Sequence, residues 1–163
     1  MLDFSNSKIL IVGDVMLDKY YFGKVDRISP EAPVPIVNIQ KEESRLGGAS
    51  NVANNIVSLG GHSLLCGVIG HDLFGKEIER ISRHKNIDTF LLKTSSPTIT
   101  KARIIGGKQQ IVRVDYEDKS ELNADNKKLF RDTISRILPE YDILVISDYG
   151  KGLISEDLCR YLI

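Results

Sequence analysis

The chain has 163 residues, about the length of one domain and long enough to bury a core without disulfides or a metal. Hydrophobic residues make up 42% and charged residues 27%, which excludes a disordered or collagen-like chain. Basic and acidic residues number 22 each, so a formal net charge of zero gives no support to a nucleic-acid partner. No apolar run reaches the roughly 18 residues of a membrane span, so we expect no membrane partner and a cytoplasmic location.

The first predicted element is a strand. A short apolar run at residues 8–12 stops at Gly13 and Asp14, as is typical of a buried strand whose following loop lies at a sheet edge. Two β-rich stretches around a proline-containing turn then predict a small hairpin over about residues 19–39. We expect this hairpin to form a lid.

The middle of the chain alternates between helix and strand patterns. Apolar residues recur at helical spacing over residues 50–59, between two glycine pairs. Strand, helix and strand patterns follow at residues 64–69, 73–84 and 89–93. This order implies parallel βαβ units.

The last third of the chain begins with a predicted hairpin. Residues 98–105 and 109–116 flank a Gly-Gly-Lys turn, which favours antiparallel pairing. A long helix over residues 123–138 and a buried strand over residues 143–147 follow, and Ser155 is placed to cap a final helix. The patterns together predict an α/β fold with a mainly parallel sheet.

Residues 47–51, Gly-Gly-Ala-Ser-Asn, carry the strongest signal for a ligand. Two glycines let the backbone approach a ligand closely, and the helix start offers N–H donors and a positive dipole end. A hydroxylated or anionic ligand would suit them. A tight turn into a helix would need the same glycines, so this segment alone leaves both interpretations open.

Two carboxylates follow the first strand. Asp14, and to a lesser degree Asp18, could accept hydrogen bonds from vicinal sugar hydroxyls, although Asp14 could equally cap a turn.

Cations on the predicted hairpins could bind a phosphate. A sugar phosphate would need some of them, although solvated surface charge also accounts for each one alone. They are Arg27, Lys101, Arg103 and Arg113.

Other residues suggest no chemistry. Cys66 and Cys159 have no CxxC partner and are expected to be free thiols in a reducing compartment. The histidines have no metal-ligand spacing, so no metal site is expected. Walker, serine-elbow and GxGxxG motifs do not occur.

The glycine segment belongs to a longer pattern that resembles the ribokinase, or phosphofructokinase-B type, family of sugar kinases. The pattern is met by Gly47, Gly48, Ala49, Asn51, Ala53, Gly60 and Gly70. Within the family, the phrases GDVMLDKYYFGKVDRISPEAPVPIV, PTITKARII, QQIVRVDYE and SDYGKG are similar to the heptose 7-phosphate kinases, and this likeness covers nearly the whole chain.

The resemblance implies a ribokinase-like three-layer sandwich with a β lid, of which residues 1–163 form the N-terminal part, truncated before the nucleotide-binding half. The implied reaction transfers the ATP γ-phosphate to the anomeric hydroxyl of D-glycero-D-manno-heptose 7-phosphate, for ADP-heptose and lipopolysaccharide inner-core synthesis. ATP and Mg²⁺ serve the full-length family, and we expect this chain to bind neither.

The resemblance also implies roles for single residues. Asp14, Gly47, Gly48 and Asn51 fall on the family's sugar-binding positions. We add Asp18 and Arg113 to the substrate-binding set, and Lys151 as a phosphate neighbour. The lid residues Arg27, Ser29, Pro30 and Glu31 would cover the sugar and contact a second copy in a homodimer.

One part of the family pattern is missing. Family members carry a Gly-Ala-Gly-Asp motif whose glycines form an anion hole and whose Asp deprotonates the acceptor hydroxyl, and these 163 residues contain no such motif. We therefore assign no catalytic residue here, expect no turnover from this chain alone, and expect the strand at residues 143–147 to have an unpaired side.

Two alternatives remain open. The chain could be a non-catalytic protein that keeps the fold for sugar-phosphate binding or subunit contact. It could also be a generic nucleotide-binding Rossmann domain, which is disfavoured because the glycines follow the predicted lid and not the first strand.

Overall fold

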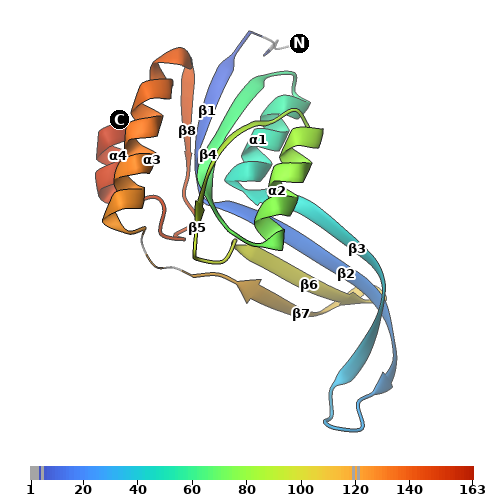
Figure 1. The fold of residues 1–163 in the computed structure, drawn as a ribbon. Helices are drawn as coiled ribbons and strands as arrows, with labels where there is room; N and C mark the ends of the chain where they lie inside the picture. Colours follow the sequence, from blue (N-terminus) through green and yellow to red (C-terminus); the bar gives the residue numbers. More distant parts are fainter. Residues whose placement is uncertain (1–3, 5, 119, 121) are drawn as a thin grey trace.

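The computed structural model describes residues 4, 6–118, 120 and 122–163, and the chain forms two four-stranded sheets (Figure 1). Sheet A is entirely parallel and has the order β5 (Asp88–Thr94), β4 (His62–Gly70), β1 (Lys8–Gly13) and β8 (Ile143–Ser147). The second sheet, here called the lid sheet, has the order β3 (Pro35–Gly48), β2 (Val15–Ile28), β6 (Thr100–Gly106) and β7 (Gln109–Tyr116).

Helices cover both faces of sheet A (Figure 1). On one face lie α1 (Ala49–Ser58) and α2 (Leu73–His84), and on the other lie α3 (Ala124–Ile137), followed by the 3₁₀ turn η1 (Leu138–Glu140), and α4 (Glu156–Leu162). Each face has its own apolar core. The expected three-layer α/β sandwich is thus confirmed.

Strand β1 is buried on both sides, which explains its continuous apolar sequence. Ile9 and Ile11 pack into the core that includes α1 and α2 residues. Leu10 and Val12 pack into the core that contains Phe130 of α3. Successive side chains of β1 therefore pack alternately into the two cores.

Side chains define where the helices begin. Asp72 accepts a hydrogen bond from the Gly75 amide at 2.8 Å, so α2 starts at the predicted residue. Asn123 caps α3, and Ser155 caps α4 by accepting from the Leu158 amide at 3.2 Å. No helix in the described part of the chain is long and apolar enough to cross a membrane.

The lid is much larger than the expected hairpin at 19–39. Strands β2 and β3 have 14 residues each, and their hairpin projects away from sheet A (Figure 1). The predicted antiparallel β6–β7 hairpin is confirmed, but it joins the same sheet because β6 pairs in parallel with β2. No local pattern indicates this pairing, since the two strands are far apart along the chain.

The topology indicates where a ligand would bind. From β1 the chain proceeds through α1 to β4 on one side, whereas β8 lies on the other side and leads into α4 on the opposite face. In open α/β sheets, ligands bind where strand order reverses in this way, at the carboxyl ends of the strands. That point lies between β1 and β8. Among the described strands β8 pairs with β1 alone, so its outer side is an edge, as expected.

Candidate functional site

Asp14 is the first residue after β1, and it is only 2% exposed. Its carbonyl oxygen accepts a hydrogen bond of 3.0 Å from the Ala49 amide. Its Oδ2 accepts from the backbone amides of Tyr149, at 2.8 Å, and Lys151, at 3.2 Å. Asp14 therefore joins the ends of β1 and β8 to the start of α1.

The buried position of Asp14 affects its acidity. Desolvation raises the pKa of its carboxyl above the ordinary value, and the amide donors of Tyr149 and Lys151 oppose that rise without cancelling it. We expected the Asp14 carboxylate to accept hydrogen bonds from sugar hydroxyls. In the structure its Oδ2 accepts from the turn that follows β8, as the alternative turn-forming role predicts.

The Gly47-Gly48 turn packs directly on Asp14. Gly48 has φ of 53° and is the N-cap of α1. A Cβ at this residue would lie 2.4 Å from the Asp14 carbonyl oxygen. The Ser50 hydroxyl donates to the carbonyl oxygens of Gly47, at 2.6 Å, and Met16, at 3.1 Å, so the turn is held from both sides. The main chain of Asp14 therefore lies against this turn.

A groove of about 690 Å³ opens between the lid sheet and the start of α1. Four of the predicted substrate-binding residues line it, namely Asp18, Gly47, Gly48 and Asn51. The groove also contains the cations Arg45, Lys85, Lys101 and Arg103, together with the Tyr20 and Tyr149 side chains. Cations therefore outnumber the Asp18 carboxylate on its wall.

Strand register explains the charge of this wall. Two rows of paired residues, two positions apart along each strand, run across the lid sheet from β3 to β7. They are Arg45–Asp18–Lys101–Asp115 and Glu43–Tyr20–Arg103–Arg113. Since residues two apart on a strand point to the same face, these eight side chains share one face, here called the inner face.

Arg103 is the most constrained cation of the inner face. Its Nη1 lies 2.5 Å from Asp18 Oδ1, and its guanidinium lies 5.2 Å from the centroid of the Tyr20 ring. The Arg45 guanidinium lies 4.8 Å from the same ring. Burial lowers the pKa of Arg103, but the Asp18 carboxylate outweighs it, so the guanidinium stays charged. Such a pair of planar cations on one ring is suited to a phosphate ester.

Sequence reasoning missed Arg45 and Tyr20 as groove residues. Neither was singled out as a candidate, and each enters the groove because β2 and β3 pair in the observed register. Side chains two apart on a strand share a face, so Tyr20 could have been inferred from Asp18. That inference would have required a predicted strand that already includes Asp18.

Other predicted residues lie outside the groove. Arg113 is exposed and pairs with Asp115 at 2.8 Å. The Lys151 ammonium lies 2.5 Å from Glu117 Oε2. Residues 27–31 form the tip of the β2–β3 hairpin, the end that is farthest from sheet A in Figure 1. In this arrangement none of them lines the wall that carries Asp18 and Asn51.

The remaining chemistry-bearing groups are placed as follows. Burial raises the pKa of the Cys66 thiol to about 12, and Cys66 and Cys159 are both free. Within residues 4, 6–118, 120 and 122–163, no three His, Cys, Asp or Glu side chains are arranged to hold a metal ion.

A three-layer α/β sandwich with a four-stranded lid sheet, and a polar groove between that lid and a Gly-Gly helix start, is the architecture of the ribokinase-like class of proteins. The chain belongs to the pfkB family of carbohydrate kinases, whose family model matches residues 6–161. This membership confirms the resemblance seen in the sequence and excludes a generic Rossmann domain.

Relatives of known sequence are similar over almost the whole chain. It is 45% identical over 156 residues to the bifunctional protein HldE of Nitratiruptor, covering 96% of this chain and 34% of that protein. It is 46% identical over 151 residues to the D-beta-D-heptose 7-phosphate kinase of Bordetella bronchiseptica, covering 92% of this chain and 48% of that protein. The chain thus spans between a third and a half of these relatives.

Solved structures share the fold at low sequence identity. A carbohydrate kinase from Agrobacterium tumefaciens superimposes with a TM-score of 0.68 at 18% identity, over 96% of this chain and 48% of that one. Phosphofructokinase-2 from Escherichia coli, in complex with fructose-6-phosphate, gives a TM-score of 0.67 at 18% identity, over 96% and 50%.

Proposed function

We propose that this chain is the acceptor-binding part of a heptose 7-phosphate kinase. The observation that carries the proposal is the groove that is lined by Asp18, Gly47, Gly48 and Asn51 together with the lid cations Arg45, Lys101 and Arg103. The 46% identity to a D-beta-D-heptose 7-phosphate kinase supports the choice of sugar.

The groove is suited to both ends of such a substrate. The Asn51 amide can donate to and accept from hydroxyl groups, and the Asp18 carboxylate can accept from them. Arg103 and Arg45, stacked on Tyr20, offer planar donors to a phosphate. Because the cations of the groove outnumber Asp18, a sugar phosphate would be preferred over the free sugar.

The reaction of the whole protein would transfer the ATP γ-phosphate to the anomeric hydroxyl of D-glycero-D-manno-heptose 7-phosphate. The product would be the 1,7-bisphosphate, on the cytoplasmic route to ADP-heptose. The side chains of this chain would hold the acceptor and exclude water from it. Transfer itself requires donors or cations around the moving phosphoryl group.

We also propose that this chain binds neither ATP nor Mg²⁺, because its 163 residues contain no Gly-Ala-Gly-Asp motif. We therefore derive no step through the nucleotide and propose that this chain alone transfers no phosphate.

The lid sheet offers a surface for a second copy. On β7, Val112 and Val114 are 45% and 38% exposed, and they alternate with Arg113 and Asp115 of the inner face. Val34 is also exposed at the hairpin end. Exposed valines on one side of an edge strand favour a homodimer through the lid.

Thermal unfolding with different ligands tests the proposal. Heptose 7-phosphate should raise the Tm of the chain, whereas ATP and NAD should not. Asn51→Ala should abolish that shift, and Asn55→Ala, an exposed asparagine of the same helix that does not line the groove, should keep it. Stabilisation by ATP or NAD without the sugar would contradict the proposal.

A phosphotransfer assay separates binding from catalysis. Purified 1–163 should show no turnover of heptose 7-phosphate with ATP and Mg²⁺. Normal turnover would contradict the proposal that this chain binds the acceptor but transfers no phosphate. The non-catalytic alternative predicts the same inactivity for the full-length protein, whereas a kinase would turn over once its remaining residues are present.

A further inference from the structure

One aromatic ring of the lid sheet contacts two of the groove cations. The Tyr20 side chain is half-buried and lines the groove. Its ring centroid lies 4.8 Å from the central guanidinium carbon of Arg45 and 5.2 Å from that of Arg103. At such distances a cation over the face of a ring is attracted to it. The Phe22 ring lies 6.1 Å from the Tyr20 ring and is inclined to it by only 11°, so Tyr20 is itself packed in place.

The position of β2 in the lid sheet explains why a single ring reaches both cations. β2 lies between β3 and β6, and Tyr20 is paired with Glu43 on one side and with Arg103 on the other. Arg45 is a diagonal neighbour of Tyr20, because it is paired with Asp18. Aromatic side chains reach both paired and diagonal neighbours on one face of a sheet. The same ring on an edge strand would have a neighbouring strand on one side only.

The two arginines keep donors for a ligand while they are held. Arg103 uses Nη1 for its ion pair with Asp18, at 2.5 Å, and Arg45 uses Nη2 for its ion pair with Glu43, at 2.7 Å. Each guanidinium has five N–H donors in a planar fork. Stacking on a ring engages the flat face of the guanidinium, so it does not consume the donors at the edge.

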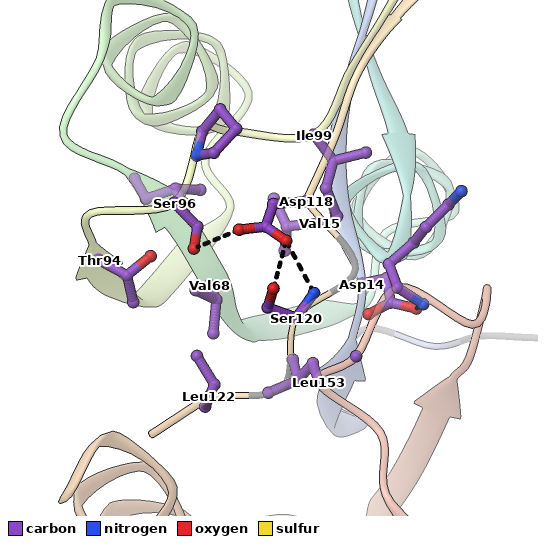
Figure 2. Close-up of a pocket in the computed structure, with 14 residues that line it drawn as sticks. Asp14, Val15, Val68, Thr94, Ser96, Ile99, Asp118, Ser120, Leu122 and Leu153 are labelled. Carbon is purple, nitrogen blue, oxygen red and sulfur yellow. Dashed lines mark hydrogen bonds between the residues drawn. The ribbon is translucent and has the colours of Figure 1, made fainter. Parts of the chain in front are cut away.

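The charge of the groove favours an anion beside these donors. Among the described residues that line the groove, four are cations and one, Asp18, is a carboxylate. Asp14 and Asp118 line a separate, smaller cavity (Figure 2), and neither of them lines the groove. A phosphate monoester carries a charge of about −1.5 to −2 at neutral pH, and planar guanidinium groups match its oxygens. Phosphate is therefore the ligand chemistry that suits this pair of arginines.

We propose that Tyr20 is a positioning residue that orders Arg45 and Arg103 into a clamp for the phosphate group of the acceptor. A free arginine side chain loses rotamer freedom when it binds, whereas one that already lies on a ring has lost part of that freedom in the unbound protein. The identity of the acceptor rests on the function proposed above. The ordering of the two arginines by the ring does not.

Side-chain NMR of the free chain tests the ordering without any ligand. The ring current of Tyr20 should shift the guanidinium Nε–Hε signals of Arg45 and Arg103. Tyr20→Phe should keep both shifts, and Tyr20→Leu should move both signals to the position of an exposed arginine. Tyr21→Leu is the matched control, because Tyr21 lies on the opposite face with its ring 5.4 Å from Lys19 Nζ. Arginine signals that do not respond to Tyr20→Leu would overturn the proposal.

Titration with inorganic phosphate and with heptose 7-phosphate tests the clamp itself. Tyr20→Leu should weaken binding by about five- to twentyfold, because two flexible side chains must then be ordered on binding. Tyr20→Phe and Tyr21→Leu should stay within about twofold of the wild type. If Tyr20→Leu does not fold, Tyr20→Ile makes the same test with a residue suited to a strand.

A double-mutant cycle separates positioning from a general structural role. In an Arg45→Ala background Tyr20→Leu should cost less affinity for phosphate than in the wild type, because one of the two ordered side chains is gone. Equal losses in both backgrounds would overturn the positioning role of Tyr20.

The two ligands also separate this proposal from the proposed function. Arginine signals that respond to inorganic phosphate and not to heptose 7-phosphate would keep the clamp and contradict the proposed acceptor. Arginine signals that respond to neither ligand would overturn the clamp.

Discussion

The amide of Ala49 donates a hydrogen bond of 3.0 Å to the carbonyl oxygen of Asp14. This bond joins the start of α1 to the end of β1, although the whole β2–β3 hairpin lies between them in sequence. Because Gly48 immediately precedes Ala49, the bond also brings the glycine turn against the sheet edge where a ligand would bind.

Gly48→Ala tests how closely the two segments pack. The new Cβ would meet Asp14 backbone at 2.4 Å, and the φ of 53° disfavours any side chain. Gly60 has φ of 86° but open space around it, so Gly60→Ala isolates the cost of the dihedral. We expect losses of about 2–5 kcal/mol for Gly48→Ala and about 1–2 kcal/mol for Gly60→Ala in urea unfolding. Equal losses would show that the packing is loose.

Asp72 should make stability depend on pH. Burial raises its pKa, but hydrogen bonds from the Thr98 amide, the Gly75 amide and the Thr98 hydroxyl outweigh that effect, so its pKa is lowered from 3.8. A lowered pKa contributes stability above the unfolded value that is lost as pH falls through the folded value.

Asp72→Asn should therefore destabilise the chain by about 1–3 kcal/mol at pH 7, since an amide nitrogen cannot accept from Thr98. The difference from the wild type should shrink below about pH 4. Asp26→Asn, at an exposed position of β2, should change little at either pH. A pH-independent loss for Asp72→Asn would contradict the assigned hydrogen bonds.

Arg103 should matter more for sugar-phosphate affinity than Arg113. Both were candidate cations, but Arg103 lines the groove beside Asp18, whereas Arg113 is exposed and paired with Asp115. Titration calorimetry with heptose 7-phosphate should show a loss of about 10–100-fold for Arg103→Ala and less than about threefold for Arg113→Ala. A larger loss of affinity for Arg113→Ala than for Arg103→Ala would show that the phosphate binds at β7 and not in the groove.

The lid surface predicts a concentration-dependent dimer. Val112→Asp should convert it to a monomer in light scattering, because a charge on the exposed β7 face opposes contact between copies. Lys108→Asp, in the β6–β7 turn, serves as the charge-change control and should stay dimeric. A wild-type chain that is monomeric at all concentrations would contradict the proposed dimer.

Local patterns predicted the helices and the core strands well. The bounds of α2 and of β8 agree with those expected, because apolar periodicity is a local signal. The lid was only partly predicted. The polar run Lys41–Arg45 has the composition of a loop, but it is a strand because it pairs with β2, for example through Lys19 and Glu42 at 3.0 Å.

The candidate site was predicted in its parts and not in its arrangement. Asp18 and the glycine turn were chosen from their residue types and positions, and Asn51 was added from the resemblance to the sugar-kinase family. The orientation of the Asp14 carboxylate could not be, since its donors Tyr149 and Lys151 follow the last strand of the sheet. Arg103 and Arg113 pair with each other on the inner face, and Arg103 lines the groove because β6 pairs with β2 whereas β7 is the edge strand, an order that no local pattern specifies.

An amide-resolved NMR titration of the ¹⁵N-labelled chain with heptose 7-phosphate tests the central proposal most directly. We predict saturable chemical-shift changes at the amides of Gly47, Gly48, Asn51, Asp18 and Arg103. The amides of residues 27–31 should not shift at concentrations at which the chain is monomeric. Shifts confined to other regions, or none up to millimolar sugar phosphate, would show that this groove does not hold the acceptor.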